Sequence, residues 1–228
     1  TRSGRVDMDR LRRLAPGFMA EYESAKAAAP DPIVDPVPER VPGAEEIGYD
    51  KADHPNCSEI LWQNLTRNPD KPAVIGPSGC LSYRELIEEA GRWGNAFAAA
   101  GLARGERIVF FLDDTPTFPA AFFGAVRAGF VPVLLNIQTK PDVLSYFLKD
   151  SGARIALTEA SLRTEFSAEV LQGTALETLV VANGDAGEAI SAETFLNGQP
   201  SALALADTGP DDMAFWMYSS GSTGRPKG

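Results

Sequence analysis

The chain of 228 residues carries 31 acidic and 21 basic side chains, a formal net charge of −10, and 44% of its residues are hydrophobic. This length and apolar content suffice for the core of one large domain or two small ones, whereas the acidic balance argues against nonspecific binding to nucleic acids or anionic membrane surfaces. No apolar run approaches the ~20 residues of a membrane span, and no signal-peptide core follows the first residues, so we expect a cytoplasmic protein.

Residues 1–54 differ in pattern from the rest of the chain. Apolar residues spaced by three and four predict an amphipathic helix, and they are Met8, Leu11, Ala15, Phe18 and Tyr22. Five prolines then predict an extended arm, at positions 30, 32, 36, 38 and 42. The sequence leaves open whether this arm packs on the main domain or on a second subunit of a homodimer.

The cysteines and the histidine offer little chemistry. Cys57 and Cys80 are the two cysteines and lack C-x-x-C spacing, so neither a disulfide scaffold nor a zinc site is expected. His54 is the sole histidine, and no partnered nucleophile is apparent for it, so we interpret it as structural or solvated.

Residues 55–228 alternate between helix and strand patterns and form the predicted main domain. A helix is predicted over 58–68, where Pro69 stops it, and a small hairpin follows that turns at residues 76–79.

The next helix has clear boundaries in the sequence. Ser82 and Glu85 have the spacing of a capping box at its start, and Gly101 is placed to close it. Trp93 and Phe97 lie on its apolar face and are predicted to belong to the core.

A continuous apolar run over 108–112 predicts a buried strand, followed by polar residues. Thr115–Pro116 is predicted to supply the cap and first position of a helix that runs to Ala128. Asp113 and Asp114 follow the strand, where paired carboxylates could bind a metal. Because no further ligands cluster there, a role at the start of the helix is the preferred interpretation.

Further strands are predicted over 130–135, 154–157 and 178–181, with a helix over 141–149. Pro132 weakens the first of these strands, because proline lacks the N–H that a sheet needs. Apolar strands joined by helices indicate a doubly wound, largely parallel α/β sheet with helices on both faces.

The last apolar run, over 213–218, predicts a buried strand. Phe215 and Trp216 alternate, so one should point to each face. They either fill the core, which is the preferred interpretation, or approach an aromatic substrate.

This strand leads into residues Tyr218–Gly228, which we call the Ser/Thr/Gly loop. Its glycines allow consecutive N–H groups to point into one concavity, and its hydroxyls and lysine add donors and positive charge. The loop is not a Walker A element, because Pro226 precedes Lys227 and Gly228 follows it. A flexible surface linker has a similar composition, but the strand before the loop favours a polyphosphate site.

The Ser/Thr/Gly loop resembles the phosphate-loop signature of the adenylate-forming superfamily of acyl- and aryl-CoA synthetases, luciferases and peptide-synthetase adenylation domains. Segments upstream resemble the same superfamily, and they are Leu81–Leu86, Gly105–Val109 and Val126–Asn136. The likeness is strongest to benzoate-CoA ligases, through Asp212–Trp216, Asp114–Pro119 and Ala121–Ala125.

The resemblance implies an activity and its cofactors. Members activate a small carboxylic acid with Mg²⁺ and ATP as an acyl-adenylate and then transfer the acyl group to CoA. In this chain the implied phosphate contacts are Ser219, Ser220, Gly221, Ser222, Thr223, Gly224, Arg225 and Lys227, where Arg225 contacts either phosphate or solvent.

The resemblance also implies that the catalytic machinery is incomplete in these residues. The family's adenine, magnesium, hinge and lid motifs are expected after the loop, in the remainder of the same chain, so we expect these 228 residues alone to be inactive, and no catalytic residue or metal ligand is assigned within them. A medium-chain fatty acyl-CoA ligase and a peptide-synthetase adenylation domain are the alternatives within the superfamily. A non-catalytic anion-binding or assembly module is the alternative from another class.

Overall fold

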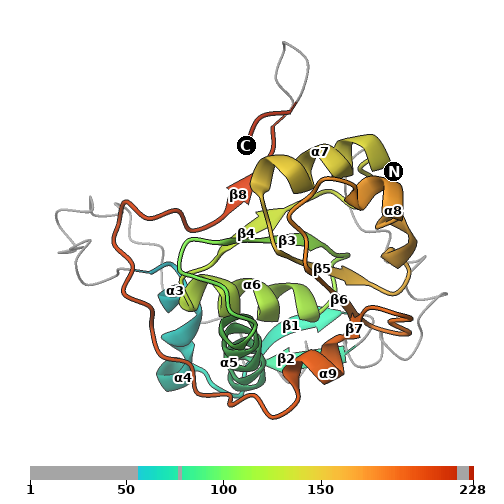
Figure 1. The fold of residues 1–228 in the computed structure, drawn as a ribbon. Helices are drawn as coiled ribbons and strands as arrows, with labels where there is room; N and C mark the ends of the chain where they lie inside the picture. The colour runs from blue at the N-terminus through green and yellow to red at the C-terminus, as the bar shows by residue number, and fades with distance from the viewer. Residues whose placement is uncertain (1–55, 77–78, 220–225) are drawn as a thin grey trace, which may run out of the picture.

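The computed structural model describes residues 56–76, 79–219 and 226–228 (Figure 1). The predicted N-terminal helix, the proline-rich arm and His54 lie outside the described residues. None of the helices in the described part is both long and apolar enough to cross a membrane.

A six-stranded sheet forms the centre of the fold. Its spatial order is β7 (Ile190–Ser191), β6 (Thr178–Ala182), β5 (Ile155–Glu159), β3 (Arg107–Phe111), β4 (Val131–Leu134) and β8 (Trp216–Met217). Every neighbouring pair in this sheet is parallel. The predicted doubly wound, largely parallel α/β sheet is therefore confirmed.

The strand order explains why helices cover both faces. The chain passes from β3 to β4 through α6 (Thr117–Arg127) and then crosses back to β5 through α7 (Pro141–Ser151). Because the two connections run in opposite directions along the sheet, their helices lie on opposite faces. Figure 1 shows α5 (Tyr83–Ala99), α6 and α9 (Ala192–Leu196) on one face, and α7 and α8 (Ala168–Leu171) on the other.

The central strand β3 is buried on both sides. Ile108 and Phe110 pack into the cluster beneath α5 and α6, whereas Val109 and Phe111 pack into the cluster beneath α7 and α8. All four side chains are fully buried. A strand covered on both faces needs apolar residues at every position, which is the pattern in the sequence.

The long helix α5 begins and ends as predicted. The Ser82 side chain accepts from the Glu85 backbone N–H, and the Glu85 carboxylate accepts from the Ser82 N–H at 2.8 Å, which completes the capping box. Gly101 has a φ of +80°, which glycine adopts without strain. Trp93 and Phe97 are buried in the core, as predicted.

The hairpin is also confirmed, but the helix before it is not. β1 (Pro72–Gly76) pairs antiparallel with β2 (Gly79–Ser82). The single helix predicted over 58–68 is wrong, because the segment forms α3 (Glu59–Trp62) and α4 (Asn64–Arg67). The Asn64 side-chain amide donates to the carbonyl oxygens of both Ile60 and Leu61, so it competes with the backbone donors that would continue the helix.

Pro132 is accommodated inside β4. Val131 and Leu135 donate their N–H groups toward β3, so the nitrogen of Pro132 faces the opposite edge. On that edge β8 pairs with β4 only from Val133 onward. The missing donor of Pro132 therefore falls where no strand needs it.

The strand predicted over 213–218 is shorter and more exposed than expected. Only Trp216–Met217 form β8, and the side chains of Met213, Phe215 and Met217 are 58%, 45% and 60% exposed. The prediction of burial is wrong for these three because β8 is an edge strand of the described sheet, and helix α6 covers this face only in part, through the contact of Phe122 with Phe215. Trp216 and Tyr218 point to the other face and pack against the cluster beneath α7, which confirms the predicted alternation.

Candidate phosphate-binding site

The two ends of the Ser/Thr/Gly loop are bonded to each other. The Ser219 N–H donates to the Lys227 carbonyl oxygen at 2.9 Å, and the Lys227 N–H donates to the Ser219 carbonyl oxygen at 3.1 Å. This antiparallel bridge, which we call the stem, closes the loop at its base. Both residues are exposed. Of the predicted phosphate contacts, the structure describes these two, and the others lie outside the described residues.

The stem stands at the carboxyl end of the sheet. β8 runs parallel to its neighbour β4, and Ser219 follows β8 after one residue, Tyr218, so the loop leaves the edge at which all six strands end. In open parallel α/β sheets, ligands bind outside the carboxyl ends of the strands. The position of the stem therefore suits a ligand-binding loop.

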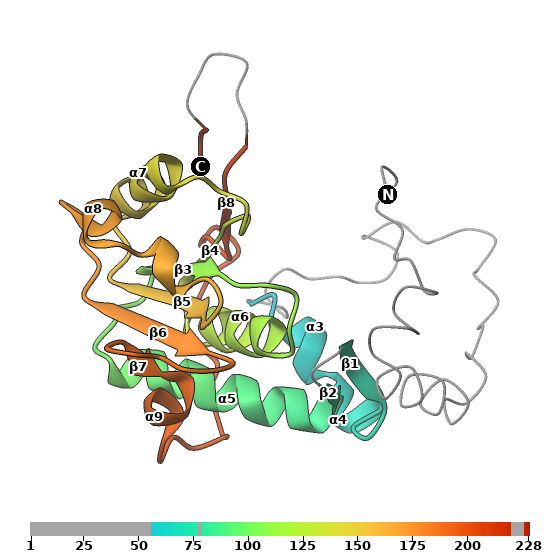
Figure 2. The same cartoon turned by 90° about the vertical axis from the view of Figure 1, so that its right-hand side faces the viewer.

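Helix α7 supports both ends of the stem. On the side that leaves β8, the Tyr218 ring stacks on Phe147 with centroids 4.0 Å apart, and its hydroxyl donates to Asp150 Oδ2 at 2.8 Å. On the returning side, the Tyr146 hydroxyl donates to the Pro226 carbonyl oxygen at 3.1 Å. Figure 2 shows residues 226–228 returning beside α7. The sequence predicted α7 but gave no sign that it contacts the loop.

Burial raises the pKa of Tyr218 above its ordinary value, and the hydrogen bond to Asp150 and the charge of that carboxylate raise it further. The folded protein therefore keeps this proton at a pH at which an unfolded tyrosine, with a pKa of about 10, loses it. The hydroxyl of Tyr218 therefore contributes its full stabilisation below a pH of about 10, the pKa of an unfolded tyrosine. This contribution decreases as the pH rises above that value.

We therefore expect the stability difference between the wild type and Tyr218→Phe to shrink as the pH rises from 9 to 11. Urea unfolding of both proteins at several pH values in this range measures the difference between their free energies of unfolding. The contributions of the other titrating groups are common to both proteins and cancel in this difference. A difference that stays constant would show that Tyr218 has the same pKa in the folded and unfolded states.

The polar residues after β3 join a second cluster at the same edge of the sheet. Helix α6 begins at Thr117 without a side-chain cap, so the prediction that Thr115 caps it is wrong. Instead the Thr115 hydroxyl donates to Glu159 Oε1 at 2.9 Å, and Asn183 Nδ2 donates to the same oxygen at 3.0 Å. Glu159 is only 8% exposed. The sequence gave no reason to pair these three.

No metal site accompanies this cluster. Across residues 56–76, 79–219 and 226–228, no three His, Cys, Asp or Glu side chains gather closely enough to hold a metal ion. Asp113 instead accepts from the Asp114 N–H and, through its carbonyl oxygen, from the Thr115 N–H. These bonds place Asp113 in the turn before α6, and α6 has no side-chain cap, so the role of the pair at the start of the helix stays a prediction.

Phe215 lies away from the stem, at the amino end of β8. It contacts Phe122 with ring centroids 5.8 Å apart and lines a groove of about 870 Å³. The preferred interpretation of Phe215 as a core residue is therefore wrong.

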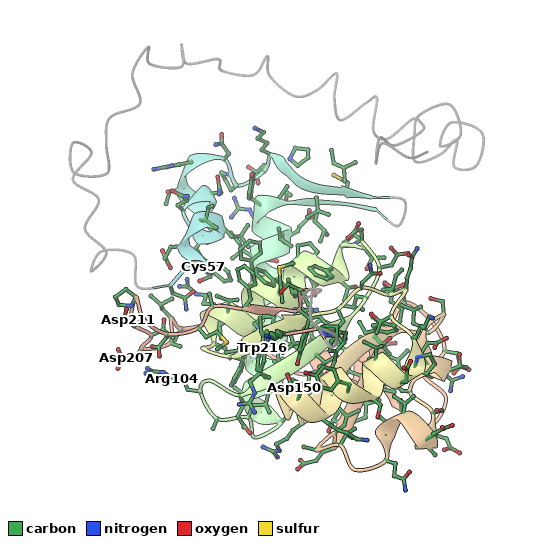
Figure 3. The ribbon with its side chains drawn as sticks, turned by 90° about the horizontal axis from the view of Figure 1, so that it is seen from above. Cys57, Arg104, Asp150, Asp207, Asp211 and Trp216 are labelled. Atoms are coloured by element: carbon green, nitrogen blue, oxygen red, sulfur yellow. The ribbon has the colours of Figure 1, made fainter. Side chains whose placement is uncertain are left out.

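Arg104 binds the segment that precedes β8. Its guanidinium donates to the carbonyl oxygen of Asp207 and to Asp212 Oδ2, the latter at 2.9 Å. Arg104, Asp150 and Trp216, which are labelled in Figure 3, line a second hollow of about 560 Å³.

The comparisons with known proteins identify the family of the chain. The family model described as AMP-binding enzyme matches residues 61–228, about three quarters of the chain. This chain belongs to the AMP-binding enzyme family. The match begins within α3 and extends through the stem.

Curated relatives within the AMP-binding family include two ligases of aromatic acids. The 3-hydroxybenzoate–CoA ligase of Aromatoleum sp. (strain CIB) is 38% identical over 175 residues, and the benzoate–CoA ligase of Thauera aromatica is 38% identical over 174 residues. Each match covers 75% of this chain and 33% of the relative. The chain thus spans about one third of the length of the curated relatives that it matches.

Solved structures of AMP-binding enzymes share the fold. The anthranilate CoA ligase AuaEII in complex with anthranoyl-AMP superposes with a TM-score of 0.73 at 30% identity, covering 78% of this chain and 35% of that one. A benzoate CoA ligase from Burkholderia xenovorans LB400 superposes with a TM-score of 0.67 at 34% identity, covering 76% and 33%.

Proposed function

We propose that this chain is the phosphate-binding part of an AMP-forming aryl-CoA ligase, in which the Ser/Thr/Gly loop holds the β- and γ-phosphates of ATP. The observation that carries the proposal is the closed stem, which presents a loop rich in hydroxyls, glycines and cations at the carboxyl edge of the sheet. A flexible linker of the same composition would not need a base that is bonded to itself and to α7.

In the proposed reaction, the carboxylate of the acid attacks the α-phosphorus of ATP. The bond between the α-phosphorus and the oxygen that bridges to the β-phosphate then breaks. Negative charge then moves onto the departing pyrophosphate, and CoA thiolate later displaces AMP from the acyl-adenylate. Donors that are already in place around the pyrophosphate stabilise this charge without reorganisation. We assign this role to Ser219, Ser220, Ser222, Thr223 and Lys227, with Gly221 and Gly224 allowing the curvature and Arg225 beside them.

Magnesium enters the proposal as the counter-ion of ATP. The described residues provide no cluster of ligands for it, so we derive no step of the reaction through Mg²⁺ from this part of the chain.

The names of the relatives favour an aromatic acid as the substrate. Relatives named as benzoate or hydroxybenzoate ligases are 36–38% identical to this chain, compared with 30% for a long-chain fatty acid ligase and 31% for a peptide synthetase. A fatty acid or an amino acid remains the alternative substrate, with the same activation chemistry.

The test measures pyrophosphate release by the whole protein that contains this chain, with MgATP, CoA and a panel of benzoates beside linear acids. We expect release with benzoates. Release with linear acids alone would discard the aryl substrate and retain the chemistry, and no release with any acid would favour the non-catalytic anion-binding or assembly module. We propose that the 228 residues alone release none, and turnover by a verified 228-residue chain would contradict that.

A lysine variant tests the role of the loop. We expect Lys227→Ala to raise the KM for ATP about tenfold, because a hydrogen bond between charged groups contributes roughly 1.5–3 kcal/mol. The KM for the acid should stay unchanged. Lys71→Ala, which removes an exposed lysine beside the hairpin, is the matched control. A KM for ATP that is equal in both variants would remove Lys227 from the site.

Two further proposals concern the setting of the protein. We place it in the cytoplasm, supported by the cytoplasmic chemistry of ATP and CoA that the proposed reaction uses. A homodimer formed through the arm of residues 1–54 stays a prediction.

A further inference from the structure

Helix α7 holds the two ends of the Ser/Thr/Gly loop by different means. Tyr218, on the side leaving β8, is fixed by packing, because its ring lies between Phe147 and Trp216, with centroid distances of 4.0 and 5.7 Å. Its hydroxyl is bonded to Asp150. Phe147 is 5% exposed, so this side of the stem is part of the core.

The returning side has no comparable packing by a large side chain of its own. Pro226 has no N–H, so its backbone contributes only an acceptor, and that acceptor receives the Tyr146 hydroxyl at 3.1 Å. Lys227 follows directly and makes the two stem hydrogen bonds with Ser219. The Tyr146 hydroxyl therefore ties the returning strand to the same helix that holds the outgoing one.

We propose that Tyr146 is a positioning residue for ATP binding, which fixes the returning end of the Ser/Thr/Gly loop and with it the backbone of Lys227. This inference rests on the proposed function of the loop. Its physical basis is preorganisation, since a loop whose ends are already fixed loses less conformational freedom when a ligand binds.

Tyr146 acts through the backbone of Pro226 and Lys227 and not by contact with phosphate. Loss of the hydroxyl should therefore loosen the stem before it affects the core. The ring of Tyr146 also packs beside Phe147 and Tyr218, at centroid distances of 5.7 and 6.3 Å. Tyr146→Phe keeps this ring and removes only the oxygen that donates to Pro226.

The experiment measures amide hydrogen exchange at Ser219 and Lys227 in the 228-residue chain, for the wild type, Tyr146→Phe and Tyr83→Phe. Tyr83 is a partly buried tyrosine at the start of α5, packed against the opposite core cluster, and serves as the matched control. We expect exchange at both stem amides to rise at least threefold in Tyr146→Phe and to stay unchanged in Tyr83→Phe. Thermal melting of each variant verifies that the fold is intact.

Unchanged exchange in a folded Tyr146→Phe would overturn the inference. The whole protein then adds a second readout, in which Tyr146→Phe should raise the KM for ATP and leave the KM for the acid unchanged. Faster exchange with an unchanged KM for ATP would overturn the role in ATP binding while the support of the stem stands. Absence of pyrophosphate release in the wild type would instead count against the proposed function, and the exchange result would still test the support of the stem.

Discussion

Replacing Gly124 with alanine should lower the free energy of unfolding by about 3 kcal/mol or more, at the upper end of the cost of overpacking a core. Gly124 lies on α6 where this helix crosses α5. A Cβ atom there would lie 2.2 Å from the Ala90 carbonyl oxygen and 2.9 Å from the Gly94 nitrogen. Both are backbone atoms, so no side-chain rotation relieves the contact and the two helices must move apart.

The opposing effect is smaller. Alanine favours a helix over glycine by about 1 kcal/mol, which offsets part of the cost. Gly209→Ala is the matched control, because a Cβ there would meet no described atom beyond its chain neighbours closer than Asp212 Oδ2, at 3.9 Å. Urea unfolding should show a large loss for Gly124→Ala and a change within about 0.5 kcal/mol for Gly209→Ala. Equal stabilities would mean that the helices can separate at little cost.

Replacing Glu159 with alanine should cost about 2–3 kcal/mol, because hydrogen bonds to a charged group contribute roughly 1.5–3 kcal/mol. One carboxylate oxygen of Glu159 accepts from both Thr115 and Asn183, which follow β3 and β6, while Glu159 itself ends β5. Glu159 is almost closed to solvent, and its removal takes this acceptor from the half-buried Thr115 and the exposed Asn183. Asn183 also has a φ of +55°, a left-handed conformation that asparagine adopts more often than most residues.

Two variants calibrate the loss at Glu159. Glu188→Ala removes an exposed glutamate from a nearby loop and should change stability little. Glu159→Gln keeps an acceptor at the same place and should lose less than Glu159→Ala. Urea unfolding compares all three with the wild type. If Glu159→Ala had the same free energy of unfolding as the wild type, the cost of burying the carboxylate would equal the stabilisation that its hydrogen bonds provide.

Local sequence determined the secondary structure and the chemistry of the loop. Ser82 and Glu85 lie three residues apart and cap a helix wherever that helix packs, and the unbroken apolar run of β3 requires cover on both faces. The composition of the Ser/Thr/Gly loop similarly predicts an anion site from its own residues. These features depend on neighbours within a few positions, so the sequence displays them directly. The prediction of one helix over 58–68 failed where the side-chain amides of Gln63 and Asn64 donate to backbone carbonyl oxygens of the preceding turn.

Tertiary structure alone decided which distant residues meet. Glu159 lies 44 residues from Thr115 and 24 from Asn183, and 80 residues separate Tyr146 from Pro226. The close approach of α5 and α6 at Gly124, and the exposure of Phe215 beside the edge strand β8, likewise arise from packing. Such contacts depend on the order of strands and the crossing of helices, which no local pattern encodes. The sequence by itself therefore determined what the loop contains, and the fold decided what holds it in place.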